Sequence, residues 1–197
     1  MRASLVVPTA LLLATLTHCD RPAPSAAAPS SSLTLQAAAA ASANAPEAKN
    51  FVAHLAGANE VPARDTRAQG EIKLQLSADG KALEYRIISS NISNVFASHI
   101  HIAPVGVNGG IVVFLFGSVP PGGGRTDGVL AAGTITAANL INALAGRPLS
   151  DLIDSIRVGH AYANVHTNDG VDGINTGPGD FPGGEIRDQI RTAGPTQ

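Results

Sequence analysis

The alternation of apolar and polar residues near residue 70 constrains the fold more than any other feature of the chain. In "GEIKLQLS" (70–77) every second residue is Ile or Leu, and the residues between them are Glu, Lys and Gln. A period of two is typical of an antiparallel strand with one buried face. "ADGK" (78–81) contains the Asp-Gly pair that hairpin turns favour, and "ALEYRIISS" (82–90) returns with the same alternation. These segments predict a β-hairpin packed on a core.

Strand patterns recur along the rest of the chain, and they are "NFVAHLAG" (50–57), "SHIHIA" (98–103), "GGIVVFLFG" (109–117), "GVLAAGTIT" (128–136), "GHAYANVHT" (159–167) and "GGEIRDQIR" (183–191). Residues 109–117 are apolar on both faces, which predicts an inner strand. The period changes at 136–146, where we expect a short helix, and again at 148–156, where Ser150 is the expected N-cap of a second one. The fold class predicted is all-β: an antiparallel Greek-key β-sandwich of about eight strands with one or two short helices before the penultimate strand.

The start of the chain is interpreted as an export signal. "LVVPTALLLATL" (5–16) follows a basic start and is too short to span a bilayer core about 30 Å thick. We expect residues 1–19 to be a signal peptide. Cys19 stands where a bacterial lipoprotein carries its lipid, but His18 before it is not small. Lipidation at Cys19 and ordinary cleavage farther on are both left open, and both predict a periplasmic, envelope-anchored or secreted protein.

Composition separates a linker from one folded domain. Residues 20–49 are rich in Ala, Pro and Ser and predict a disordered linker. The domain is expected at 50–192, followed by a flexible tail at 193–197. A net charge of −2 argues against nucleic acid as a partner. One cysteine excludes an intrachain disulfide. A domain of this size is expected to be a stable monomer.

Polar side chains share one face on three of the predicted strands. His99 and His101 alternate with Ile100 and Ile102, and if the isoleucines face the core, both histidines lie outside. The same alternation puts Tyr162, Asn164 and His166 on one face of their strand, and Glu185, Arg187 and Gln189 on one face of the last strand. If these strands are neighbours, the groups form a cluster.

Four motifs in this order resemble the chordin-type (CHRD) domain, which is found in bacterial secreted proteins and in the animal developmental antagonist chordin. They are "HLAGANEVP" (54–62), "ASHIHIAPVGVNGGIVVFL" (97–115), "AYANVHT" (161–167) and "PGGEIRDQI" (182–190). The resemblance covers residues 51–191 and implies an all-β extracellular domain, which in animals is attached to growth-factor-binding modules. The family's marked positions fall on Glu60, Pro62, His99, His101, Gly109, Tyr162, Asn164, His166, Thr167, Gly184, Glu185, Arg187 and Gln189.

The chain departs from the family pattern in two places. Asp188 replaces the usual glycine, on the face assigned to the core, so either a buried carboxylate needs a partner or the face assignment is wrong there. The second departure is the long loop 168–180, which replaces a short connection. Its acidic residues do not have the spacing of an EF-hand, so a solvated loop is favoured over a calcium site.

Two functions of different classes follow from the sequence. The first is an exported, non-enzymatic binding or interaction module whose partner is an extracellular or envelope protein or a matrix ligand. In it the histidines hydrogen-bond neighbouring strands, with Tyr162, Asn164, Glu185 and Arg187 as a supporting polar network in which Glu185 and Arg187 satisfy each other. No Gly-x-Ser-x-Gly motif points to a hydrolase, and no cysteine nucleophile remains after export.

The second is a mononuclear copper or zinc protein, with redox activity as one variant. Alternate side chains on a strand lie about 6.6 Å apart, and an imidazole nitrogen binds Zn or Cu at about 2.0 Å. His99 and His101 can therefore converge on one ion, with His166 as the third ligand. The sequence favours the interaction module, and the metal protein is the alternative.

Overall fold

The computed structural model describes residues 47–171 and 177–194. The expected signal peptide with Cys19, most of the expected linker, residues 172–176 of the long loop and residues 195–197 lie outside the described part. All of the described residues belong to one compact unit. Within this part, no helix is both long and apolar enough to cross a membrane.

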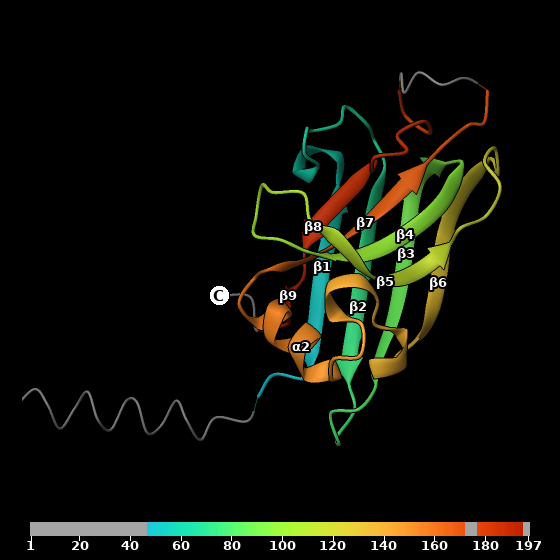
Figure 1. Ribbon diagram of the computed structural model, residues 1–197. Coiled ribbons are helices and arrows are strands. Elements are labelled where there is room, and N and C mark those ends of the chain that lie inside the picture. Colours follow the sequence, from blue (N-terminus) through green and yellow to red (C-terminus); the bar gives the residue numbers. More distant parts are fainter. Residues whose placement is uncertain (1–46, 172–176, 195–197) are drawn as a thin grey trace, which may run out of the picture. The chain divides into compact units, whose positions relative to one another are not determined.

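The described residues form a β-sandwich of nine strands (Figure 1). The strands are β1 (Asn50–Ala56), β2 (Gln69–Leu76), β3 (Leu83–Ser93), β4 (Val95–Ile102), β5 (Gly110–Gly117), β6 (Arg125–Ile135), β7 (Ala161–Thr167), β8 (Ile186–Gln189) and β9 (Arg191–Thr192). The pairs are antiparallel and follow the order β5-β4-β7-β8-β1-β2-β3-β6, with β9 beside β1. β4, β5, β7 and β8 make one layer, and the other four strands of this order lie behind it (Figure 1). The all-β prediction is confirmed.

The hairpin predicted for residues 70–90 is present. β2 and β3 pair from Gln69↔Ser90 to Leu76↔Leu83. The turn is closed by a hydrogen bond from Ser77 N to Ala82 O, 2.8 Å long, and Gly80 has a φ of 71°, which glycine adopts without strain. Ile72 is fully buried while Lys73 is exposed, as the alternation requires.

The prediction of an inner strand at 109–117 is wrong, because β5 ends the order of paired strands. Val112 and Val113 are both buried although they are consecutive, because a register shift in the β4–β5 ladder places them around a bulge. Phe114 is 47% exposed. The apolar run therefore reflects a bulged edge strand, and one of its aromatic rings faces outward.

The helical segment also differs from the expectation. Residues 136–146 form two 3-10 helices, η2 (Ala137–Asn139) and η3 (Asn142–Leu144), instead of one α-helix. Thr136 does cap η2, but Asn142 has a left-handed φ of 50°, which interrupts a regular helix. The second helix is α2 (Leu149–Arg157), and its N-cap is Pro148, so Ser150 is not the cap. A further 3-10 helix, η1 (Gly57–Asn59), follows β1.

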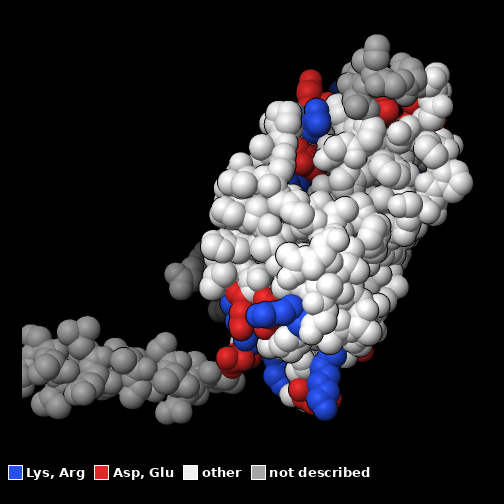
Figure 2. Space-filling model, in the orientation of Figure 1, with Lys and Arg blue, Asp and Glu red and all other residues white. Residues whose placement is uncertain are grey.

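The core between the two layers decides which side chains face outward. The layer formed by β4, β5, β7 and β8 is called the front layer. Its side chains that are fully buried in this core include Ile100, Ala163, Val165 and Ile186. Their sequence neighbours therefore point away from it, onto the outer face of β4, β7 and β8. Figure 2 shows that Lys, Arg, Asp and Glu gather toward the two ends of this face and are sparse over its middle.

Candidate metal centre

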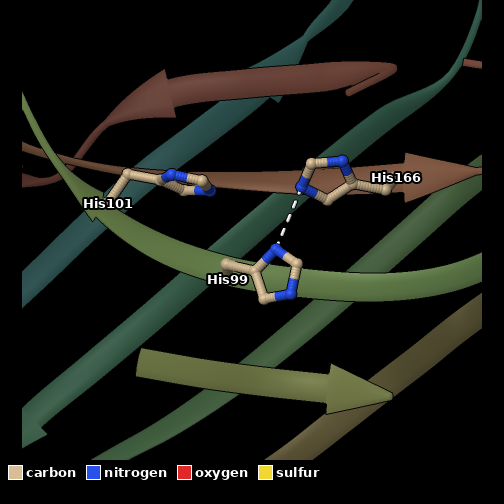
Figure 3. A group of neighbouring side chains, drawn as sticks. All are labelled: His99, His101 and His166. Atoms are coloured by element: carbon tan, nitrogen blue, oxygen red, sulfur yellow. Dashed lines mark hydrogen bonds between the residues drawn. The ribbon is translucent and has the colours of Figure 1, made fainter. Parts of the chain in front are cut away.

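β4 and β7 bring three histidines together on the outer face of the front layer (Figure 3). The β4–β7 ladder places His99 opposite Asn164 and His101 opposite Tyr162, and it places His166 opposite Ala97. The next ladder places Asn164 opposite Arg187 of β8. The predicted cluster therefore exists, because the three strands that carry it are direct neighbours.

The histidines are buried, which corrects the expectation that they lie outside. His99 is 6% exposed, and His101 and His166 are each 7% exposed. The side chains do face away from the core, but loops before β5 and before β8 lie against them. The carbonyl of Gly109 contacts His101 and that of Pro182 contacts His166. Alternation predicts the face of a side chain; it does not predict which loop covers that face.

Backbone carbonyls fix the tautomers of two histidines. His101 Nδ1 lies 3.0 Å from Gly109 O, and His166 Nδ1 lies 2.8 Å from Pro182 O. A carbonyl oxygen only accepts hydrogen bonds, so both Nδ1 atoms donate. In the neutral ring Nε2 then carries the lone pair. Most histidines that bind metals are oriented in this way by a hydrogen bond from the other ring nitrogen.

His99 completes the group with a different environment. Its Nδ1 lies 3.0 Å from His166 Nε2 (Figure 3). Its Nε2 is buried and has no hydrogen-bond partner among the described residues. The ring packs edge-to-face on Phe114, with 4.6 Å between the ring centroids. His99 is therefore held by aromatic packing on one side and by the other histidines on the other.

Burial keeps the three imidazoles neutral. Desolvation lowers the pKa of His99 to about 3, with help from the neighbouring His166 and His101. Desolvation likewise lowers the pKa of His166 to about 4. The pKa of His101 is also lowered, first by burial, although its bonds to Gly109 and Asn164 oppose the shift. Neutral imidazole is the form that binds a metal ion.

The spacing of the nitrogens fits one ion after a small adjustment. One ligand nitrogen of each histidine lies within 4.8 Å of the other two. Two nitrogens bound at about 2.05 Å in a tetrahedral site lie about 3.3 Å apart. The shortest nitrogen pair, at 3.0 Å, is close to that value. The largest separation has to close by roughly 1.5 Å, which modest turns of side chains achieve.

An aromatic and cationic stack supports His101. The Tyr162 ring is nearly parallel to the His101 ring, at 4° and 4.7 Å between centroids. The guanidinium carbon of Arg187 lies 3.4 Å from the centre of the Tyr162 ring. Arg187 is 2% exposed and donates to Asn108 Oδ1 and Val107 O, each at 2.8 Å. The stack fixes the plane of the His101 ring.

Glu185 and Arg187 do not satisfy each other, contrary to the expectation. Glu185 is fully buried and accepts hydrogen bonds from Thr66 Oγ1, Thr167 Oγ1 and Gly179 N. These bonds join the segment before β2 to the end of β7 and to the loop before β8. Glu185 therefore holds the loop that carries Pro182 in place, while Arg187 supports the tyrosine stack.

Sequence reasoning missed the carbonyls of Gly109 and Pro182, because main-chain groups leave no signal in residue type. Gly109 was among the positions carried over from the family, and the structure gives a reason for it. A Cβ at this position would collide with the carbonyl of Ile102. Glycine thus lets the loop before β5 approach β4 closely enough for its carbonyl to reach His101.

Comparison with known proteins identifies one family. Residues 51–190 of the chain match the family described as the CHRD domain. No curated protein and no solved structure matched the chain. The matched range includes all three histidines, Tyr162, Asn164 and the supporting residues of β8.

Proposed function

The chain belongs to the CHRD domain family, and from this premise we propose that it is an exported, non-enzymatic binding module whose ligand is one Zn²⁺ or Cu²⁺ ion. The proposed ligands are His99, His101 and His166. The observation that carries the proposal is the convergence of their nitrogens within 4.8 Å, from two adjacent strands.

The tautomers and the neutral charge of the histidine rings support metal binding over a purely structural hydrogen-bond network. A network of hydrogen bonds would pair the ring nitrogens with protein donors and acceptors. Here Nδ1 of His101 and of His166 donate to carbonyls, and each Nε2 lone pair faces Asn164 Oδ1, at 3.1 Å and 2.9 Å, which is a second acceptor and not a donor. Burial also lowers the pKa of all three rings, so protons compete weakly for the lone pairs at neutral pH.

The ligand atoms that the domain offers favour Zn²⁺ or Cu²⁺. The chain has one cysteine and one methionine, Cys19 and Met1, so the domain from residue 50 onward contains no sulfur ligand. Imidazole suits zinc, copper, iron and nickel, and the absence of thiolate and thioether ligands argues against Cu⁺ and iron–sulfur clusters. Among divalent ions a given nitrogen site binds Cu²⁺ more tightly than Zn²⁺. With copper bound, redox activity is an additional proposal.

A metal titration with histidine variants tests the proposal. The domain spanning residues 47–197, freed of metal with a chelator, is expected to bind one equivalent of Zn²⁺ or Cu²⁺ and to melt at a higher temperature when loaded. The variant His101→Ala is expected to lose this stoichiometric binding. His160→Ala is the matched control, because His160 is exposed and outside the cluster, and it should bind as the unchanged protein does.

The opposite result would favour the interaction module without a metal. If the unchanged domain takes up no metal and His101→Ala only lowers the melting temperature, the histidines serve the packing of β4 on β7. The module would then bind a protein or matrix partner through another part of its surface.

A further inference from the structure

The Asn164 side chain lies among the histidine lone pairs. Asn164 is 2% exposed and comes from the middle of β7. Its Oδ1 lies 2.9 Å from His166 Nε2 and 3.1 Å from His101 Nε2. Its backbone carbonyl accepts a 2.7 Å hydrogen bond from Ser98 Oγ, which ties the residue to β4. The amide oxygen is therefore held at a defined point between two rings.

Asn164 Oδ1 and its two neighbours, His101 Nε2 and His166 Nε2, are all hydrogen-bond acceptors. His101 and His166 each donate from Nδ1 to a backbone carbonyl, so each neutral ring has a lone pair at Nε2. An amide oxygen also has only lone pairs to offer. Asn164 Oδ1 and the two Nε2 atoms that lie 2.9 Å and 3.1 Å from it repel one another unless a proton or a cation lies among them.

From this geometry, and resting on the proposed metal site, we infer that Asn164 Oδ1 is a fourth ligand. The ion then has three imidazole nitrogens and one amide oxygen. In a tetrahedral site with bonds of about 2.0–2.2 Å the ligand atoms lie about 3.3 Å apart. The three measured edges, at 2.9, 3.0 and 3.1 Å, form a chain from His99 through His166 and Asn164 to His101.

A fourth protein ligand changes what the site does. A zinc site with four protein ligands is closed and holds its ion structurally, whereas a site with three protein ligands leaves a position for water or substrate. The inference therefore makes this a site that holds an ion, and the ion has no free position for an added anion. An amide turned by 180° would instead donate its two N–H groups to the lone pairs and leave the fourth position open.

Binding of azide to the Co²⁺-loaded domain separates these arrangements. The visible spectrum of the unchanged domain is expected to stay the same when azide is added, because the ion has no open position. Asn164→Ala is expected to respond to azide and to bind the metal about 10-fold to 100-fold more weakly. Asn164→Asp keeps an oxygen at this point, so it is expected to remain insensitive to azide. His160→Ala again serves as the matched control.

The results distinguish this inference from the proposed function. Metal binding that is lost in His101→Ala supports the three-histidine site whatever azide does. If azide changes the spectrum of the unchanged domain, or if Asn164→Ala leaves both spectrum and affinity unaltered, the fourth ligand is refuted and the site retains three ligands. If Asn164→Ala does not fold, the unchanged domain and Asn164→Asp decide the question. Absence of metal binding by the unchanged domain refutes both.

Discussion

Glu60 is a buried carboxyl beside the tyrosine stack. It is 6% exposed, and its Oε1 has no hydrogen-bond partner among the described residues. Burial raises the pKa of Glu60 to about 7, although Arg187 and Arg64 lower it in part. Gly184 provides the space for this carboxyl, since a Cβ there would collide with it. Two of the family's marked positions are thus explained by one contact.

The raised pKa of Glu60 predicts a pH-dependent stability. The unfolded carboxyl titrates near 4.5, so its contribution to folding is complete below pH 4.5 and is lost as the pH rises through about 7. The substitution Glu60→Gln removes this dependence. At pH 8 it should stabilise the metal-free domain by about 3 kcal/mol relative to the unchanged protein, and at pH 4.5 the two should be similar.

Urea unfolding at several pH values measures this difference. Glu84→Gln is the control, because Glu84 is exposed, and it should change stability little at either pH. A Glu60→Gln variant whose stability relative to the unchanged protein is the same at pH 4.5 and pH 8 would show that the carboxyl is not held in its neutral form.

At the scale of single residues, the sequence predicted the direction of the site's side chains but not their surroundings. Period-two alternation correctly placed His99 and His101 opposite Ile100. It could not predict that both histidines are buried, because their cover comes from loops whose paths depend on main-chain contacts. The role of Asn164 depends on the orientation of two ring nitrogens, and residue type does not encode that orientation.

At the scale of elements, Asp188 joins the two layers where β8 meets β1. The ladder between these strands has one pair, Ala56↔Arg187, before β9 resumes beside Phe51 and Val52. In the gap, Asp188 Oδ2 accepts a 3.0 Å hydrogen bond from the backbone N–H of His54 and pairs with Arg191 at 3.0 Å. The carboxylate of Asp188, which the sequence placed toward the core, is therefore half-buried and is bound by the His54 N–H and by Arg191.

Removing this carboxylate should weaken the junction. Asp188→Ala removes the acceptor of the exposed His54 N–H, and we expect a loss of about 0.5–1.5 kcal/mol in the free energy of unfolding. Asp188→Asn keeps an oxygen in place and should lose less than half as much. Hydrogen exchange at the His54 amide is expected to accelerate in the alanine variant. Equal stability and equal exchange in all three proteins would contradict this role.

Strand and helix predictions differed in accuracy because they depend on different signals. Alternation and the Asp-Gly turn are local, and both were confirmed at β2 and β3. Leu140 and Leu144 are four residues apart, a spacing that fits an α-helix, yet the left-handed Asn142 divides the segment into η2 and η3. The side chain of Asn142 donates to Ile111 O of β5, so a tertiary contact accompanies the break.

At the scale of the whole molecule, the hydrogen-bonded strands form one continuous order whose two ends are β5 and β6. Tyr85 of β3 reaches across the open side and donates a 2.7 Å hydrogen bond to Leu115 O of β5. Its ring passes over Gly133 of β6, where a side chain would crowd it. This contact links β3 to β5 on the side where the hydrogen-bonded path is open.

The order of the strands could not be predicted from alternation alone. A period of two specifies the face of each residue, but it does not specify the neighbour of the strand. The pairing of β4 with β7, and of β8 with β1, joins segments more than 50 residues apart. The proposed metal centre depends on the first of these pairings. The family resemblance points to His99, His101 and His166 among its marked positions, and the β4–β7 ladder explains why these three residues lie together.

The most direct test of the central claim is an anomalous difference map from crystals of the Zn²⁺-loaded domain, recorded at the zinc absorption edge. We predict one peak per chain, at about 2.0–2.1 Å from a nitrogen of each of His99, His101 and His166. A map with no peak among these rings, or with its peak at the exposed His54 or His160, would contradict the claim.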